Sequence, residues 1–195
     1  MMMRGLTALT IALLLAGCVP NNVRQDDMAT FDLGEPLGGW AAPALRGVDV
    51  ATPSWLGGAA MQYRLDYSEA ARRRVFAESR WAAPPGELIE QALRRRALAG
   101  GSGAALPCRL RVDLDEFAQV FEAKQSSRVV LAVRANLLSR NEQAVASRGF
   151  AIERPAGADA RGGVAAASLA VQELSAKLAG WIEAEKSALA TRCDK

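Results

Sequence analysis

Alternating apolar and polar positions mark the strands that this chain is expected to form. In residues 61–67 every odd position is apolar or aromatic and every even position is polar, which is typical of a strand with one buried face. Residues 75–81 continue as its hairpin partner, after a turn over residues 68–74. Two shorter candidate strands come earlier in the chain, at residues 30–33 and 45–51.

The second half of the chain alternates in the same way. Residues 108–114 are expected to form one strand, and the alternation changes phase over residues 115–117, which predicts a β-bulge. A longer strand over residues 127–138 pairs with residues 145–153 through a turn at residues 141–143. Consecutive strands joined by short turns favour antiparallel pairing.

Two stretches have helical periodicity instead. In one, Pro84, Pro85 and Glu87 are typical of a helix start and the Gly-Gly pair at 100–101 ends it. The longer one follows the pair at 162–163 and runs to about Ala190. Its turns beyond Ile182 are mostly polar or alanine, so they either project into solvent or meet a partner. This order of elements predicts an α+β fold, a mixed, largely antiparallel β-sheet with two helices packed on one face.

The first 17 residues have the layout of a secretory signal, with a positive charge, a short apolar stretch and two small residues. Leu15, Ala16, Gly17 and Cys18 together match the bacterial lipobox, in which the cysteine is acylated and becomes the first residue of the mature protein. Cys18 is therefore expected to carry a covalent diacylglycerol and an N-acyl chain, and no other cofactor is predicted. The alternatives are a plain signal peptide with an incidental cysteine, or a buried N-terminal helix.

Acyl chains hold a protein at a membrane by burying methylenes, at about 0.8 kcal/mol for each CH₂. Cys18 would thus be an anchor rather than a nucleophile. Val19 follows it where an aspartate would signal retention in the inner membrane, so the lipoprotein sorting rule favours the periplasmic face of the outer membrane. Residues 1–17 are then the signal peptide, residues 18–29 a lipidated, flexible tether and residues 30–195 one folded domain.

Composition mainly excludes classes of function. The 195 residues carry a formal net charge of +3, and an exported protein would rarely meet nucleic acid, so no nucleic-acid partner is expected. The absence of histidine removes Ser/His/Asp and Cys/His machinery and most zinc sites. Asp113 and Asp115 could in principle act as a carboxylate pair, but a solvated, charge-alternating strand face is the simpler interpretation. No catalytic residue and no metal ligand is predicted.

Cys108 and Cys193 remain once the signal is removed. An even pair in an oxidising compartment predicts one disulfide. The bridge would close a loop of about 85 residues, for which the chain-entropy contribution is on the order of 4 kcal/mol. The alternative is two independent thiols, one buried and the other on a frayed tail.

The four tryptophans could build a lipid-binding pocket or an interface. Trp81 and Trp181 lie on apolar stripes and are predicted to belong to the core. Trp40 and Trp55 lie in Gly- and Pro-rich loops, so they are the candidate partner or lipid contacts.

Four segments of the chain also keep a distinctive order and spacing. They are residues 63–67 (YRLDY), 79–88 (SRWAAPPGEL), 110–117 (LRVDLDEF) and 178–182 (LAGWI). In these segments the chain resembles the ABC-type transport auxiliary lipoproteins, which include the paraquat-inducible protein C-like lipoproteins. The similarity spans about Thr30 to Ile182, nearly all of the mature chain.

The resemblance implies an outer-membrane lipoprotein that accompanies an MCE-domain (mammalian cell entry) protein and an inner-membrane ABC transporter in moving lipids across the periplasm. It implies a docking or receiving component and no catalysis. A structural or assembly lipoprotein of another cell-envelope machine is the alternative. The sequence leaves open whether the chain forms a homo-oligomer.

Overall fold

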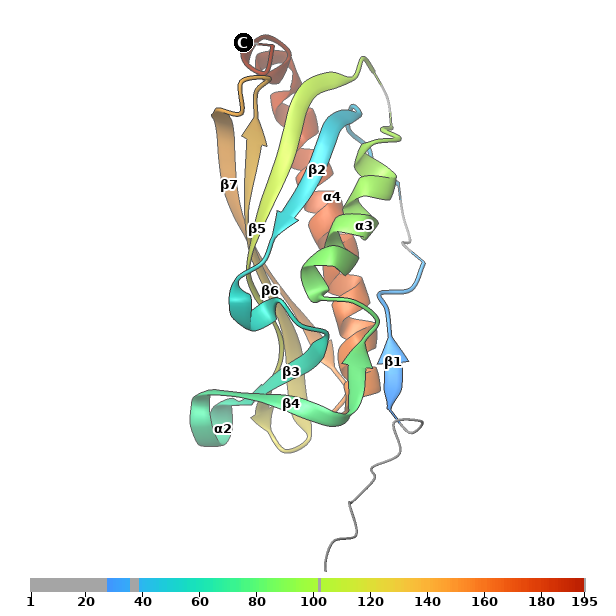
Figure 1. Ribbon diagram of the computed structural model, residues 1–195, viewed down its shortest axis with the longest axis vertical. Helices are drawn as coiled ribbons and strands as arrows, with labels where there is room; N and C mark the ends of the chain where they lie inside the picture. The colour runs from blue at the N-terminus through green and yellow to red at the C-terminus, as the bar shows by residue number, and fades with distance from the viewer. Residues whose placement is uncertain (1–27, 36–38, 102, 195) are drawn as a thin grey trace, which may run out of the picture.

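The computed structural model describes residues 28–35, 39–101 and 103–194 (Figure 1). Its elements follow one another as β1 (Ala29–Phe31), β2 (Leu45–Ala51), η2 (Ser54–Leu56), β3 (Ala60–Leu65), α2 (Asp66–Glu69), β4 (Ala70–Trp81), α3 (Pro85–Ala97), β5 (Leu106–Ala123), β6 (Ser126–Leu138), β7 (Ala144–Ala156) and α4 (Ala160–Arg192). The predicted α+β fold is confirmed.

Seven strands form one sheet built around β5. Along one edge, β5 pairs with antiparallel β6, and β7 adds to β6 in the same sense. The other edge of β5 is shared, because parallel β2 lies opposite residues 106–113 and parallel β3 lies opposite residues 119–121. β4 and then β1 extend the sheet from β3. Most paired positions are antiparallel, as predicted.

The two long helices, α3 and α4, lie on the same side of the sheet (Figure 1), as predicted. Inward side chains of β5 and β6, such as Leu110, Leu114 and Leu131, are buried together with Leu174 and Leu178 of α4. The 33 residues of α4 extend over about 50 Å, so this helix spans the long axis of the molecule. In the described part of the chain no long helix covers the opposite face of the sheet, which carries polar side chains.

The two ends of the long axis are built differently (Figure 1). One end holds the last turns of α4, the β6–β7 turn and the start of β5, and is named the disulfide end. The other holds the start of α4, the start of β1 and a ribbon of η2, β3, α2 and β4 that extends away from the helices. This ribbon, residues 54–81, is named the arm.

The predictions of secondary structure fail at the tip of the arm. β3 ends at Leu65, and residues 68–74, which were expected to form a turn, contain part of α2 and the first residues of β4. Tyr67 is consequently exposed instead of lying on a buried strand face. The predicted bulge in β5 is confirmed as a register shift between Leu114 and Glu116.

Candidate interaction surfaces

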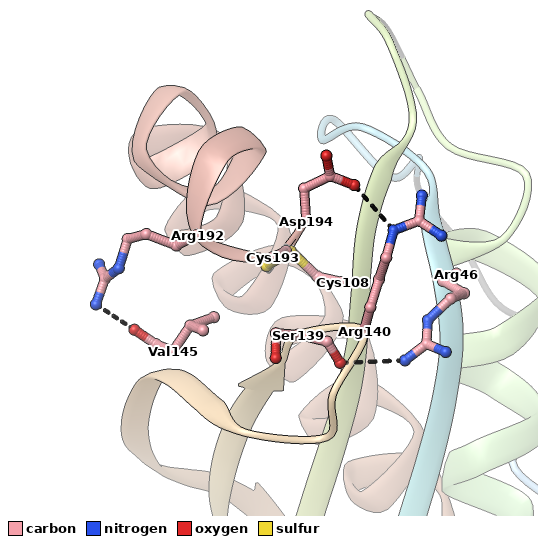
Figure 2. Close-up of a disulfide and its surroundings, with 8 residues drawn as sticks. All are labelled: Arg46, Cys108, Ser139, Arg140, Val145, Arg192, Cys193 and Asp194. Atoms are coloured by element: carbon pink, nitrogen blue, oxygen red, sulfur yellow. Dashed lines mark hydrogen bonds and ion pairs between the residues drawn. A yellow bond between two sulfur atoms is a disulfide. The ribbon is translucent and has the colours of Figure 1, made fainter.

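At the disulfide end, the residue that follows α4 is covalently joined to β5 (Figure 2). The sulfur atoms of Cys108 and Cys193 are 2.02 Å apart, the two Cα atoms are 5.1 Å apart, and both residues are fully buried. Of the two alternatives that the sequence left for these cysteines, the structure contains the bridge.

Hydrogen bonds hold the same part of α4 against the β6–β7 turn. The Arg140 N–H donates to the Cys193 carbonyl at 3.0 Å, and the Arg140 side chain pairs with Asp194 at 2.9 Å. Arg192 donates to a carbonyl of β7 (Figure 2), and Leu189 is fully buried. One face of the final turns therefore packs on the domain itself, and only the other face is open to solvent or a partner.

An open groove of about 920 Å³ lies beside this end. Its walls come from the segment that enters β2, the segment that enters β5 and the outward face of α4. Basic side chains outnumber acidic ones along it, with Arg46, Arg140 and Lys186 against Asp194. Lys186 pairs across one turn of its own helix, with Glu183. Each of the three basic side chains is thus held in place by a carboxylate, Arg46 by Glu142, Arg140 by Asp194 and Lys186 by Glu183.

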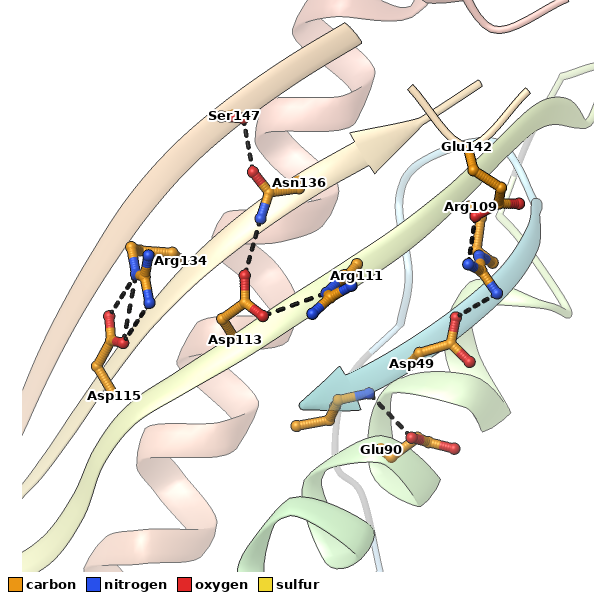
Figure 3. Close-up of polar contacts among 11 residues, drawn as sticks. Asp49, Glu90, Arg109, Arg111, Asp113, Asp115, Arg134, Asn136, Glu142 and Ser147 are labelled. Carbon is orange, nitrogen blue, oxygen red and sulfur yellow. Dashed lines mark hydrogen bonds and ion pairs between the residues drawn. The ribbon is translucent and has the colours of Figure 1, made fainter. Parts of the chain in front are cut away.

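The helix-free face of the sheet carries a ladder of paired charges (Figure 3). Arg109 of β5 bridges Asp49 of β2, at 3.2 Å, and Glu142 in the β6–β7 turn. Arg46 also donates to Glu142, at 2.9 Å. The hydrogen bond from Arg46, together with the charge of Arg109, holds the pKa of the Glu142 carboxyl below the ordinary value of a glutamate.

The ladder continues along β5 toward the arm (Figure 3). Arg111 pairs with Asp113 at 3.2 Å, and the Asn136 amide also donates to Asp113. Arg134 makes a bidentate pair with Asp115, whose hydrogen bonds and charge raise the pKa of the guanidinium. These two aspartates thus form part of a solvated, charge-alternating face, as the sequence indicated.

Glu116 of β5 holds two arginines of the arm in place. Its carboxylate pairs with Arg64 and with both terminal nitrogens of Arg73, at 2.9 and 2.8 Å. The Arg73 guanidinium in turn lies 5.8 Å from the centre of the Trp55 ring. Trp55 is exposed, so its side chain has the access that a contact residue needs.

The contact prediction is wrong for Trp40, which is only 4% exposed. Its Nε1 donates to the Pro43 carbonyl at 3.3 Å. The loop that carries Trp40 approaches the turn after α3 so closely that a Cβ on Gly101 would stand 2.0 Å from the Trp40 carbonyl oxygen. Trp40 therefore belongs to the core, together with Trp81 and Trp181, which were predicted to lie there.

The lipobox, residues 15–18 with Cys18, lies outside the described residues, as do the signal peptide and most of the tether. Within the part of the chain that the structure describes, no helix is both long and apolar enough to cross a membrane. In residues 28–35, 39–101 and 103–194, no group of three or more His, Cys, Asp or Glu is placed to hold a metal ion.

Comparison with known proteins identifies the family. The sequence matches the model of the ABC-type transport auxiliary lipoprotein component family over residues 48–179, from β2 into α4. The chain belongs to the ABC-type transport auxiliary lipoprotein family. Family membership makes it a membrane-associated lipoprotein of the cell envelope and an auxiliary component of a transporter. No curated protein matches the chain.

Solved structures share the fold of this auxiliary lipoprotein. Protein XCC0632 from Xanthomonas campestris, assigned to the DUF330 family, is similar over 83% of this chain and 95% of its own, with 20% identity and a TM-score of 0.66. A second crystal structure, of an uncharacterized protein, covers 80% of this chain and 98% of its own, with 18% identity and a TM-score of 0.60. At these identities the similarity concerns the fold alone.

Proposed function

We propose that this auxiliary lipoprotein is anchored through acylated Cys18 at the periplasmic face of the outer membrane. There it docks an MCE-domain protein of an ABC-type lipid transport system, and it performs no catalytic step. The observation that carries the proposal is the family match over residues 48–179, preceded in the same chain by a lipobox. A docking component needs this combination of a membrane anchor and a folded binding domain.

The two ends of the domain lie at different distances from the proposed anchor. β1 starts at the arm end (Figure 1). Ten residue steps separate Cys18 from Met28, and such a segment reaches at most about 35 Å. α4 extends about 50 Å from the arm end to the disulfide end. An anchor beside the arm therefore leaves the disulfide end facing the periplasm, where an inner-membrane transporter and its partner would be met.

The disulfide end also has the features of a docking surface. Its backbone is fixed by the Cys108–Cys193 bridge and by hydrogen bonds to the β6–β7 turn, so a partner would meet a preorganised surface. Three basic side chains line the groove there, Arg46, Arg140 and Lys186. Such a surface favours a partner that presents acidic groups at its edge.

The test is affinity purification of the acylated protein from detergent-solubilised envelopes, with mass spectrometry of the proteins and lipids that co-purify. We expect an MCE-domain protein to be recovered. Stoichiometric phospholipid alongside it would add a lipid-carrier role. Recovery of cell-wall or secretion components without an MCE-domain protein would overturn the proposal in favour of a structural or assembly lipoprotein.

A pair of lysines on α4 tests the docking surface itself. Lys186 lines the groove, whereas Lys177 does not, yet both are about half exposed and both pair with a glutamate of the same helix. Lys186→Glu is expected to lower recovery of the MCE-domain protein several-fold, because it reverses a charge at the interface. Lys177→Glu should leave recovery unchanged, and equal losses from both substitutions would contradict docking at this end.

A further inference from the structure

We infer that the arm is a second, non-covalent membrane contact. In this arrangement Trp55, Tyr67 and Val75 enter the headgroup region of an anionic phospholipid surface, and the neighbouring arginines meet its phosphates. The inference rests on the proposed anchor at Cys18 and adds a contact that the acyl chains alone do not require.

Exposed apolar side chains gather on the arm. Of the five large hydrophobic side chains that are exposed among the described residues, three lie on it, namely Trp55 (53%), Tyr67 (47%) and Val75 (56%). They come from three different elements, η2, α2 and β4. Tryptophan and tyrosine are enriched where water meets lipid, because each combines an apolar ring with one polar N–H or O–H group.

The arm is also basic. Residues 54–81 contain five arginines and three acidic residues. At the tip, Glu69 pairs with Arg72 at 3.0 Å and with Arg74 at 2.7 Å, and the Arg72 side chain remains exposed. Guanidinium groups held in this way are attracted to anionic headgroups and can bind phosphate in a bidentate manner.

The geometry of β4 places the apolar and basic groups together. Arg73 and Val75 are two residues apart on a strand and share one face, and Arg73 lies over the Trp55 ring at 5.8 Å. Phe76 points to the opposite face, where it lines a small cavity with Ala167 of α4. The face that carries Trp55 and Val75 is therefore turned away from α4 and is free to meet a surface.

The tether argues for a membrane as the occupant of this surface. β1 starts at the arm end (Figure 1), and only ten residue steps separate Met28 from Cys18. Ten residue steps span at most about 35 Å. Once the acyl chains are inserted, the arm is thus held close to the bilayer at a high effective concentration, and individually weak contacts are sufficient to bind it.

Trp55 can itself report the contact, because Trp40, Trp81 and Trp181 are buried. The acylated mature protein is reconstituted into vesicles of phosphatidylethanolamine and phosphatidylglycerol whose acyl chains carry bromine, a quencher of nearby indoles. We expect the exposed part of the tryptophan emission to be quenched, and this quenching to be lost in Trp55→Phe. Vesicles without phosphatidylglycerol should quench less, because the arginines then lack anionic partners.

Two further variants retain Trp55 as the fluorescent reporter. Tyr67→Ser with Val75→Ser should reduce the quenching of Trp55, whereas Leu98→Ser should not, because Leu98 is also exposed but lies at the far end of α3. Equal quenching of Trp55 in wild type, in the Tyr67→Ser and Val75→Ser double variant and in Leu98→Ser would overturn the inference.

Flotation of the same vesicles tests the anchor separately. If the protein floats with the vesicles and Trp55 is not quenched, the arm contact is wrong and the anchor stands. If the protein does not float, the anchor fails, and the inference fails with it. A change in Trp55 emission that requires added MCE-domain protein would make the arm a protein-docking surface and would also overturn the membrane contact.

Discussion

The disulfide end and the arm lie at opposite ends of one sheet and are held by different forces. At the disulfide end, a fully buried covalent bond joins residues 85 positions apart, and backbone hydrogen bonds fix the turns around it. In the arm, β3 and β4 pair at only a few positions with an irregular register, and one carboxylate, Glu116, holds two arginines. The first region has the fixed geometry proposed to meet a protein partner, and the second has the exposed side chains proposed to meet a bilayer.

Removing the disulfide is expected to have the largest effect on the difference between the two ends. Replacing Cys108 and Cys193 by alanine together is expected to lower the free energy of unfolding by about 4 kcal/mol, because the unfolded chain is no longer closed into a loop. Urea denaturation measures the change, and reduced wild-type protein should match the variant. An unfolding midpoint that stays at the oxidised wild-type value would show that the bridge does not hold this end.

Glu116→Gln would loosen the other end. Loss of the carboxylate leaves Arg64 and Arg73 without their shared partner, and we expect a cost of about 1–2 kcal/mol together with faster amide exchange in β3 and β4. Asp115→Asn, one residue earlier in the same strand, removes an exposed pair and should cost clearly less than Glu116→Gln. Equal costs for the two substitutions would contradict a special role for Glu116.

The N-cap of α4 should stabilise only the end of this helix that lies beside the arm. The Asp159 side chain accepts the Gly162 N–H at 2.7 Å, and Asp159→Ala is expected to cost about 1 kcal/mol. Hydrogen exchange should rise in the first turn of α4, at the arm end, and stay slow near Cys193. Uniform exchange changes along the whole helix would contradict this separation.

The smallest expected effect is on pH dependence. The pKa values of Glu142, at the disulfide end, and Glu69, at the arm tip, lie below the ordinary 4.5, chiefly because of hydrogen bonds from Arg46 and Arg72. Each ionised carboxylate therefore adds stability above that value, and the contribution is lost as the pH falls through the lowered pKa. Unfolding midpoints at low salt should fall less on acidification in Glu142→Gln than in wild type, and added salt should remove the difference. An unchanged acid profile would rule out this contribution.

The elements that could be predicted from the sequence are the long ones with one buried face. β5, β6, β7 and both long helices follow from periodicity because each turns one face toward the core, although β7 buries only Ile152 fully, and the break in phase near Asp115 marks the bulge. The sharing of one edge of β5 between β2 and β3 could not be predicted, because it depends on contacts between segments about 60 residues apart.

The surfaces were harder to predict than the fold. Cys108 and Cys193 could be paired by reasoning from the compartment, but nothing local in the sequence brings them together. Trp40 was misplaced because its burial depends on a close approach to Gly101 in a distant turn. Glu116 was overlooked as the anchor of the arm, because only the bulge and the parallel pairing of β3 with β5 place it beside Arg64 and Arg73.

The division of roles between the two ends is tested most directly by photo-crosslinking in living cells. A photoreactive amino acid is introduced in place of Lys186, beside the groove, and separately in place of Tyr67, on the arm. We expect the probe at position 186 to form a crosslink to an MCE-domain protein, and the probe at position 67 to form crosslinks to phospholipid. A protein crosslink from position 67 with none from position 186 would contradict the assignment of the disulfide end to the partner and of the arm to the membrane.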